Sequence, residues 1–95
     1  MIESEPTLKC VIAWSDRRNL CSLVEETLKQ RLGETEVRKL GEDSLVCYGL
    51  AAPDEVRDLV AGVLDAAESV LVVEFEKWSG RGPGMDAEWL MRRGH

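Results

Sequence analysis

Hydrophobic and polar residues alternate in two stretches of the chain. In residues 8–14 the larger apolar side chains occupy every second position, and residues 69–76 change from a β-branched run into the same alternation. A repeat of two is typical of a strand, because successive side chains point to opposite faces of a sheet. Both stretches therefore predict β-strands.

Apolar residues recur at helical spacing in two other stretches. Between residues 20 and 32 they lie mostly three or four positions apart, and Asp16 and Asn19 are both candidate N-caps for the helix predicted there. In the second stretch Pro53 precedes two carboxylates, a combination that favours a helix start, and an apolar stripe continues to Ala67. The pattern predicts two helices, the second extending to this alanine.

The segments between and after these helices contain turn residues. Residues 36–40 and 44–50 suit the two strands of a β-hairpin, with Gly, Glu and Asp at positions 41–43 of the turn. Residues 79–84 contain three glycines and a proline, which prevent regular structure there. They separate the main body from residues 86–93, which the sequence leaves open between a short helix and a strand.

The order of predicted elements, β-α-β-β-α-β, predicts an α+β fold. Its common compact solution is the ferredoxin-like arrangement, a four-stranded antiparallel sheet with both helices on one face. We expect a disordered N-terminus at residues 1–6 and one ferredoxin-like domain at residues 7–78. Residues 79–95 would form a glycine-rich loop and a C-terminal segment that docks on the core or on a partner.

The predicted strands carry apolar residues on both faces, although the two helices would cover only one. The face left open is predicted to collect six residues: Val11, Ala13, Val46, Tyr48, Val70 and Val72. A soluble monomer seldom exposes an apolar patch of this kind, so we expect this face to bind a second copy or another protein. Trp78 and Trp89 would anchor the C-terminal segment to the core or to the partner, because Trp supplies a large contact area at interfaces.

Charge and composition narrow the classes of function. The 95 residues carry a net charge of −6, which disfavours passive binding to nucleic acid. Residues 77–95 are the one basic segment. Within it Lys77, Arg81, Arg92 and Arg93 are candidates to pair with the acidic second helix or with the Glu74 and Glu76 edge of another subunit. The absence of a leader and of an apolar stretch of about 20 residues predicts a cytoplasmic protein without a membrane partner.

Asp16 is the candidate catalytic residue. It stands at the predicted end of the first strand, where its carboxylate would hold a divalent metal beside a phosphodiester while Arg17 and Arg18 bind phosphate. The alternative interpretation is that Asp16 caps the first helix and both arginines are solvated.

Histidine and cysteine offer little further chemistry. His95 is the single histidine and the last residue, which disfavours Ser-His-Asp and Cys-His sites and the usual zinc sites. The remaining metal option is a three-thiolate site from Cys10, Cys21 and Cys47. Since Cys10 and Cys47 are predicted on neighbouring strands, they would approach each other, but buried inert thiols are the favoured interpretation.

Several segments together have a recognisable pattern: residues 13–16 (AWSD) with Arg17, residues 44–50 (SLVCYGL), residues 52–58 (APDEVRD), residues 69–75 (SVLVVEF) with Trp78, and residues 88–90 (EWL). In these segments the chain resembles the CRISPR-associated protein 2-like proteins, which include the VapD-type toxins. It implies a homodimer formed through the sheet faces, with the C-terminal segment docking on the partner.

The resemblance also implies a role for Asp16. In family members that cut RNA or DNA, an aspartate at the end of the first strand is the metal-linked residue, and Mg²⁺ or Mn²⁺ would be its cofactor. That aspartate usually follows an aromatic residue directly, whereas Ser15 stands between Trp14 and Asp16 in this chain. We therefore do not transfer nuclease activity.

Three hypotheses for function follow. The first is a homodimer that acts through protein contacts, without catalysis and without a cofactor. The second is a metal-dependent phosphodiesterase acting on RNA or DNA through Asp16. The third is an acidic inhibitor, antitoxin or immunity-type protein that occupies a basic surface on its target.

Overall fold

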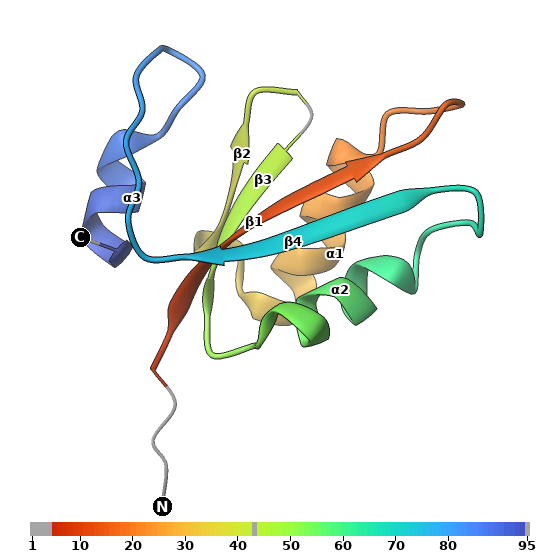
Figure 1. The fold of residues 1–95 in the computed structure, drawn as a ribbon, viewed down its shortest axis with the longest axis horizontal. Helices are drawn as coiled ribbons and strands as arrows, with labels where there is room; N and C mark the ends of the chain where they lie inside the picture. Colours follow the sequence, from red (N-terminus) through yellow and green to blue (C-terminus); the bar gives the residue numbers. More distant parts are fainter. Residues whose placement is uncertain (1–4, 43, 95) are drawn as a thin grey trace, which may run out of the picture.

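The computed structural model describes residues 5–42 and 44–94, which form an α+β fold (Figure 1). Its elements in chain order are β1 (Thr7–Trp14), α1 (Cys21–Leu32), the 3₁₀ turn η1 (Glu34–Glu36), β2 (Val37–Leu40), β3 (Ser44–Gly49), α2 (Pro53–Ala61), β4 (Ser69–Phe75) and α3 (Ala87–Gly94). The four strands pair antiparallel in the order β2-β3-β1-β4. This topology is compatible with the predicted ferredoxin-like arrangement.

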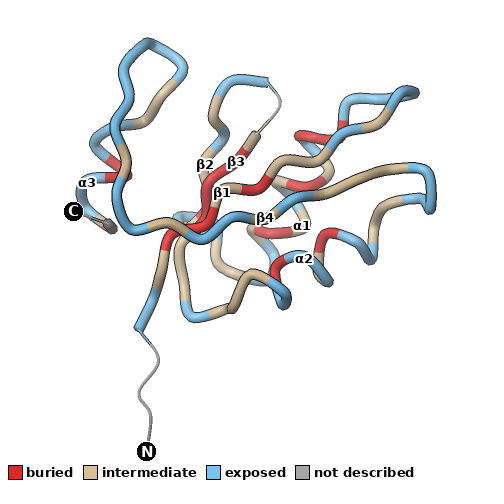
Figure 2. Tube along the Cα trace, viewed as in Figure 1, coloured by how far each residue is buried: buried red, intermediate tan, exposed pale blue. Residues whose placement is uncertain are grey.

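Helices α1 and α2 cover one face of the sheet, and the main core lies between them and the strands. Figure 2 shows the buried residues concentrated on the central strands β1 and β3 and on the inner sides of α1 and α2. The core residues are Val11, Leu20, Cys21, Val24, Leu28, Val37, Leu45, Cys47, Val56 and Val60. Small and β-branched side chains dominate this set on the strands, which lets the helices pack close to the sheet.

The helices lie on the opposite face of β1 and β4 from the one predicted. Four residues predicted for the open face pack under the helices instead: Val11, Ala13, Val70 and Val72. The prediction placed the larger side chains of β1 under the helices, but the smaller set lies there. The face without α1 and α2, called the open face below, carries Leu8, Ile12 and Trp14. Val46 and Tyr48 lie on it as predicted, opposite Cys10 and Leu8 in the register of β1 and β3.

The C-terminal segment covers part of the open face. Trp89 and Leu90 of α3 are buried against Leu8 and Val46, and Trp78 packs at the edge of the same cluster. In Figure 1 α3 lies beside β2 and β3, at the far side of the sheet from the loop that joins α2 to β4. Within this chain, the predicted terminal helix therefore forms and docks on its own sheet.

The second helix is shorter than predicted. It ends at Ala61, and the next turns are 3₁₀-like, with the Val63 amide donating to the Val60 carbonyl and the Leu64 amide to the Ala61 carbonyl. Glycine at position 62 favours this ending, because it carries the highest helix cost of any residue except proline. The predictions for Asp43, for His95 and for residues 1–4 of the N-terminal segment fall outside the described residues.

Candidate functional site

The loop that follows β1 contains the residues predicted to carry chemistry. It borders a surface cavity of about 410 Å³ whose lining includes Ile12, Trp14, Asp16, Arg18 and Glu42. The cavity therefore brings the end of β1 together with the turn between β2 and β3. Ile12 and Trp14 in its lining belong to the open face, and the lining also holds two carboxylates, Asp16 and Glu42.

Asp16 does not cap the first helix. The Oδ1 atom of Asn19, the other candidate, accepts a hydrogen bond of 2.8 Å from the backbone amide of Cys21. Asp16 is exposed, and its carboxylate makes no hydrogen bond or ion pair with any residue in the ranges 5–42 and 44–94. The capping interpretation of Asp16 is thus wrong, and its side chain is available to a partner.

Arg17 and Arg18 are occupied by carboxylates of the loop before β4. Arg17 Nη2 lies 3.0 Å from Asp65 Oδ2, and Arg18 donates from Nε and Nη2 to the two carboxylate oxygens of Glu68, each at 2.7 Å. Planar pairing of this kind is the strong form of an arginine–carboxylate contact. We call these four residues the arginine clasp. Because the clasp uses both guanidinium groups, neither is free for the predicted role in phosphate binding.

The clasp changes the ionisation of Glu68. Its side chain is only 1% exposed. The Arg18 guanidinium, followed by the hydrogen bond from the Asp65 amide, lowers the pKa of Glu68 from its ordinary 4.5 to about 2. Glu68 consequently stays ionised throughout the pH range in which most proteins are folded.

The clasp makes the free energy of unfolding depend on pH. Since the pKa of Glu68 is lower in the folded chain than in the unfolded one, its contribution is complete above pH 4.5 and is lost as the pH falls towards 2. In Arg18→Gln we expect the pKa of Glu68 to return towards 4.5, measurable by NMR titration of the carboxyl carbon. The difference in unfolding free energy between wild type and variant should shrink from neutral pH to pH 2.

Arg57→Gln is the matched control for this prediction. Arg57 pairs with its neighbour Asp58 on the surface of α2, where both side chains are more than half exposed. Its removal should leave the acid dependence of unfolding unchanged, because surface pairs contribute little. A constant difference between wild type and Arg18→Gln across the pH range would show that the clasp does not couple to Glu68 ionisation.

The thiols do not form a metal site. Cys10 and Cys47 lie on neighbouring strands, as predicted, but Cys10 pairs with Val46 and Cys47 with Lys9, so their side chains point to opposite faces of the sheet. Among the described residues, no three His, Cys, Asp or Glu side chains gather in a way that would hold a metal ion. Burial raises the pKa of Cys47 to about 11 and also raises that of Cys10, which leaves both thiols protonated and unreactive.

The burial of Lys9 was not predicted from the sequence. Lys9 is 1% exposed on the helix-covered face, where its Nζ atom donates to the carbonyls of Gly49 at 2.7 Å and Thr7 at 3.1 Å. Burial lowers the pKa of this ammonium group. The sequence does carry one indication of this burial: the alternation of side chains along β1 places Lys9 on the same face as Val11. These contacts give it a structural role.

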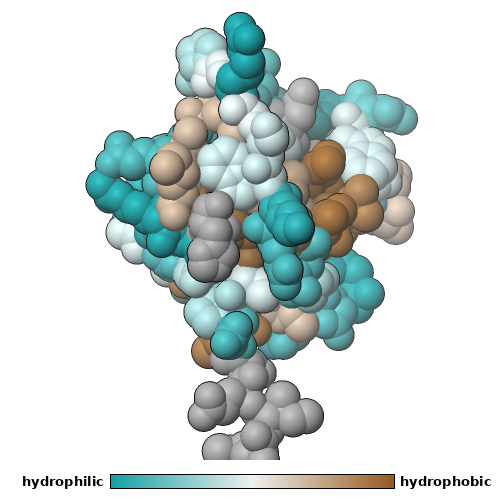
Figure 3. All heavy atoms as spheres, turned by 60° about the vertical axis from the view of Figure 1, so that its left-hand side comes forward, coloured by the Kyte–Doolittle hydropathy of each residue, from teal (hydrophilic) through white to brown (hydrophobic). Residues whose placement is uncertain are grey.

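Part of the open face stays uncovered by α3. Trp14, Leu71 and Val73 are 51%, 49% and 45% exposed, and the half-buried Ile12 lies opposite Leu71 in the register of β1 and β4. We call these four residues the apolar strip. In Figure 3 hydrophobic atoms gather at the right-hand side of the molecule, where the open face comes into view. The sequence pattern placed the four residues of the strip on the helix-covered face, so it did not predict that they would be exposed.

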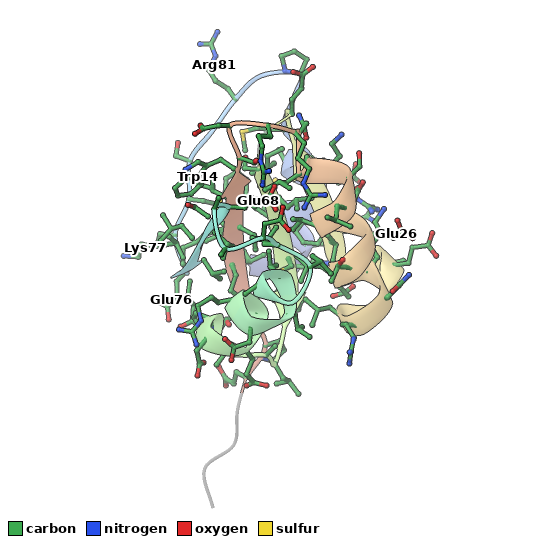
Figure 4. The ribbon with its side chains drawn as sticks, turned by 90° about the vertical axis from the view of Figure 1, so that its right-hand side faces the viewer. Trp14, Glu26, Glu68, Glu76, Lys77 and Arg81 are labelled. Atoms are coloured by element: carbon green, nitrogen blue, oxygen red, sulfur yellow. The ribbon has the colours of Figure 1, made fainter. Side chains whose placement is uncertain are left out.

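Charged groups of both signs lie beyond the ends of the strip and on the loop that follows β4. Five of them have no ion-pair partner in the described part of the chain: Asp16, Glu42, Glu76, Lys77 and Arg81. Figure 4 shows Trp14, Glu76 and Lys77 extending on the side of the sheet opposite to Glu26 of α1. The other basic residues of the tail are used within the chain, Arg92 by Glu88 and Arg93 by Glu36. Lys77 and Arg81 are therefore the tail cations still available for pairing with another subunit.

Comparisons with known proteins leave the function open. No protein-family model, curated protein or solved structure matches this chain. No helix in the described ranges is long and apolar enough to cross a membrane. Function is therefore inferred from the residues and geometry described above.

Proposed function

We propose that the protein is a ferredoxin-like homodimer, related in organisation to the CRISPR-associated protein 2-like proteins, that acts through protein contacts without catalysis. The observation that carries this proposal is the apolar strip on the open face. Neither α1, α2 nor α3 covers it, and its side chains lie next to one another on two paired strands. Adjacent large apolar side chains on one exposed sheet face are typical of an interface.

The size of the strip sets the expected strength of association. Full burial of a large apolar side chain contributes about 1.5–3 kcal/mol, so covering the exposed halves of Trp14, Leu71 and Val73 in both copies contributes about 6 kcal/mol. Association itself costs about 4–15 kcal/mol in lost freedom of motion. The strip alone therefore supports a weak dimer, and contacts at its rim are needed for a stable one.

The charges at the rim favour a second copy of this chain as the partner. A two-fold interface brings the same patch of both copies together, so a rim with unpaired charges of both signs can complement itself. Nucleic acid would need a rim that is basic throughout. The rim instead offers the carboxylates of Asp16 and Glu42 at one end and Glu76 with Lys77 at the other.

The other two hypotheses have weaker support. A phosphodiesterase would use Arg17 and Arg18 for phosphate, but the arginine clasp holds both of them on Asp65 and Glu68. The same contacts neutralise two of the acidic residues that an acidic inhibitor would present to a basic target. Neither alternative makes use of the apolar strip.

Sedimentation equilibrium over a micromolar concentration series tests the proposal. We expect the wild type to approach twice its chain mass of 10.6 kDa. Leu71→Asp should stay at the mass of one chain, because the dimer would bury a carboxylate without a partner. Circular dichroism would verify that the variant keeps its fold.

Leu50→Asp is the matched control. Leu50 is 64% exposed, even more than Leu71, but it lies in the connection between β3 and α2, away from the strip. The same change of charge and polarity there should leave the dimer intact. A wild-type chain that stays monomeric throughout, or a folded Leu71→Asp variant that dimerises as well as Leu50→Asp, would overturn the proposal.

A further inference from the structure

The apolar strip ends at two unpaired charges. The register of β1 and β4 runs from the Trp14–Ser69 pair at one end to the Leu8–Phe75 pair at the other. Asp16 follows Trp14 by two residues, and Lys77 follows Phe75 by two. Both charged side chains therefore lie beyond the strip, at opposite ends.

The two ends differ in net charge. At the Trp14 end, Asp16 shares the rim of the cavity with Glu42, while the nearby Arg18 is held by Glu68. At the other end Lys77 is adjacent to Glu76, and Figure 4 shows both on the helix-free side of the sheet. The Trp14 end is therefore acidic, whereas the other end carries Lys77 as a cation available for pairing.

Two-fold symmetry leaves two ways of stacking the open faces. A rotation axis parallel to the strands places like ends together, which opposes the acidic groups Asp16 and Glu42 to their own copies. An axis that lies in the plane of the sheet and crosses the strands at right angles exchanges the ends. The acidic end of one copy then meets Lys77 of the other. Charge repulsion disfavours the first arrangement and charge attraction favours the second.

The strand register fits the second arrangement. Asp16 is four residues beyond Ile12, and Lys77 is four residues beyond Val73. Ile12 pairs with Leu71 and Val73 with Cys10, and these two pairs are adjacent on the open face, because the Val11–Val72 pair between them faces the helices. An axis that passes between them places each Lys77 at the same end of the interface as Asp16 of the other copy.

We infer that Asp16 of one copy and Lys77 of the other form an ion pair at both ends of the dimer interface. This inference rests on the proposed homodimer and specifies its orientation. It gives the unpartnered Asp16 carboxylate a role in assembly, with the strip supplying the apolar contact and the two ion pairs setting the direction of the strands. Increasing salt should weaken the dimer, because rim ion pairs are screened.

Charge reversal tests the pair. Asp16→Lys and Lys77→Asp should each weaken dimerisation about three- to tenfold, since each change affects two symmetric exposed contacts. Chains that carry both changes should regain wild-type affinity. An equimolar mixture of the two single variants should form heterodimers in preference to either homodimer, because both ion pairs exist again only between unlike chains.

Glu26→Lys and Lys39→Asp are the matched controls for these charge changes. Glu26 lies on α1, on the helix side of the molecule, and Lys39 is exposed on β2. Neither control should alter dimerisation. A dimer that forms normally but shows no recovery in the double variant and no preference in the mixture would overturn the ion pair and leave the proposed function standing. A monomeric wild type would overturn both.

Discussion

Replacing Trp89 by alanine is expected to release α3 from the open face and to lower the free energy of unfolding by about 3–5 kcal/mol. The Trp89 indole is 4% exposed, packs with Leu8 and Val46, and donates from Nε1 to the Thr35 carbonyl at 2.8 Å. The Arg93 guanidinium also lies 4.4 Å from the centre of its ring. Urea unfolding would measure the loss, and hydrogen exchange would show α3 amides losing protection before those of β1.

Two further variants separate the parts of this contact. Met91→Ala lies on the same helix but alters a side chain that is 65% exposed, so it should change the unfolding free energy by less than about 0.5 kcal/mol. Trp89→Phe retains an aromatic ring and loses the hydrogen bond to Thr35, with an expected cost near 1 kcal/mol. Equal effects of Trp89→Ala and Met91→Ala would contradict the view that Trp89 anchors the helix.

Replacing Lys9 by alanine is expected to lower the free energy of unfolding by about 2–4 kcal/mol, a large effect for a surface-type residue. The change removes a buried four-carbon stem from the helix-covered face and leaves the Gly49 and Thr7 carbonyls without their donor. Lys9→Met fills most of the same volume and should cost less than alanine. Equilibrium unfolding in urea would rank the two variants.

Lys39→Ala provides the comparison for this lysine. Lys39 is exposed on β2, and its truncation should leave the unfolding free energy within about 0.5 kcal/mol of wild type. If Lys9→Ala were as mild as Lys39→Ala, the hydrogen bonds of Lys9 to the two carbonyls would have no energetic importance.

The arginine clasp shows what limits inference from a single sequence. The paired arginines after the first strand and the acidic residues before the last strand are visible in the sequence, but nothing along the chain connects them. They meet because β1 and β4 are adjacent and antiparallel, so the end of β1 at Trp14 lies beside the start of β4 at Ser69. The sequence feature that indicates the clasp is the opposite charge of these two loops, which the strand order places together.

The apolar strip illustrates a different limit. Periodicity of two shows that residues 8, 10, 12 and 14 share one face of β1, but it does not show which face the helices cover. Both sets of side chains on β1 are largely apolar, so burial patterns could not separate them. The choice depends on how α1 and α2 pack across the sheet, and close packing favours the smaller set that contains Val11 and Ala13.

The sequence by itself determined the order and type of the elements from β1 to β4 and the hairpin turn, because apolar spacing and turn residues act over a few neighbouring positions, whereas it left the terminal segment open between helix and strand. Only the tertiary structure decided that Arg17 and Arg18 pair with Asp65 and Glu68, and that the strip lies on Trp14 and Leu71. These features depend on contacts between residues far apart in the chain, which the strand order and the packing of the helices bring together.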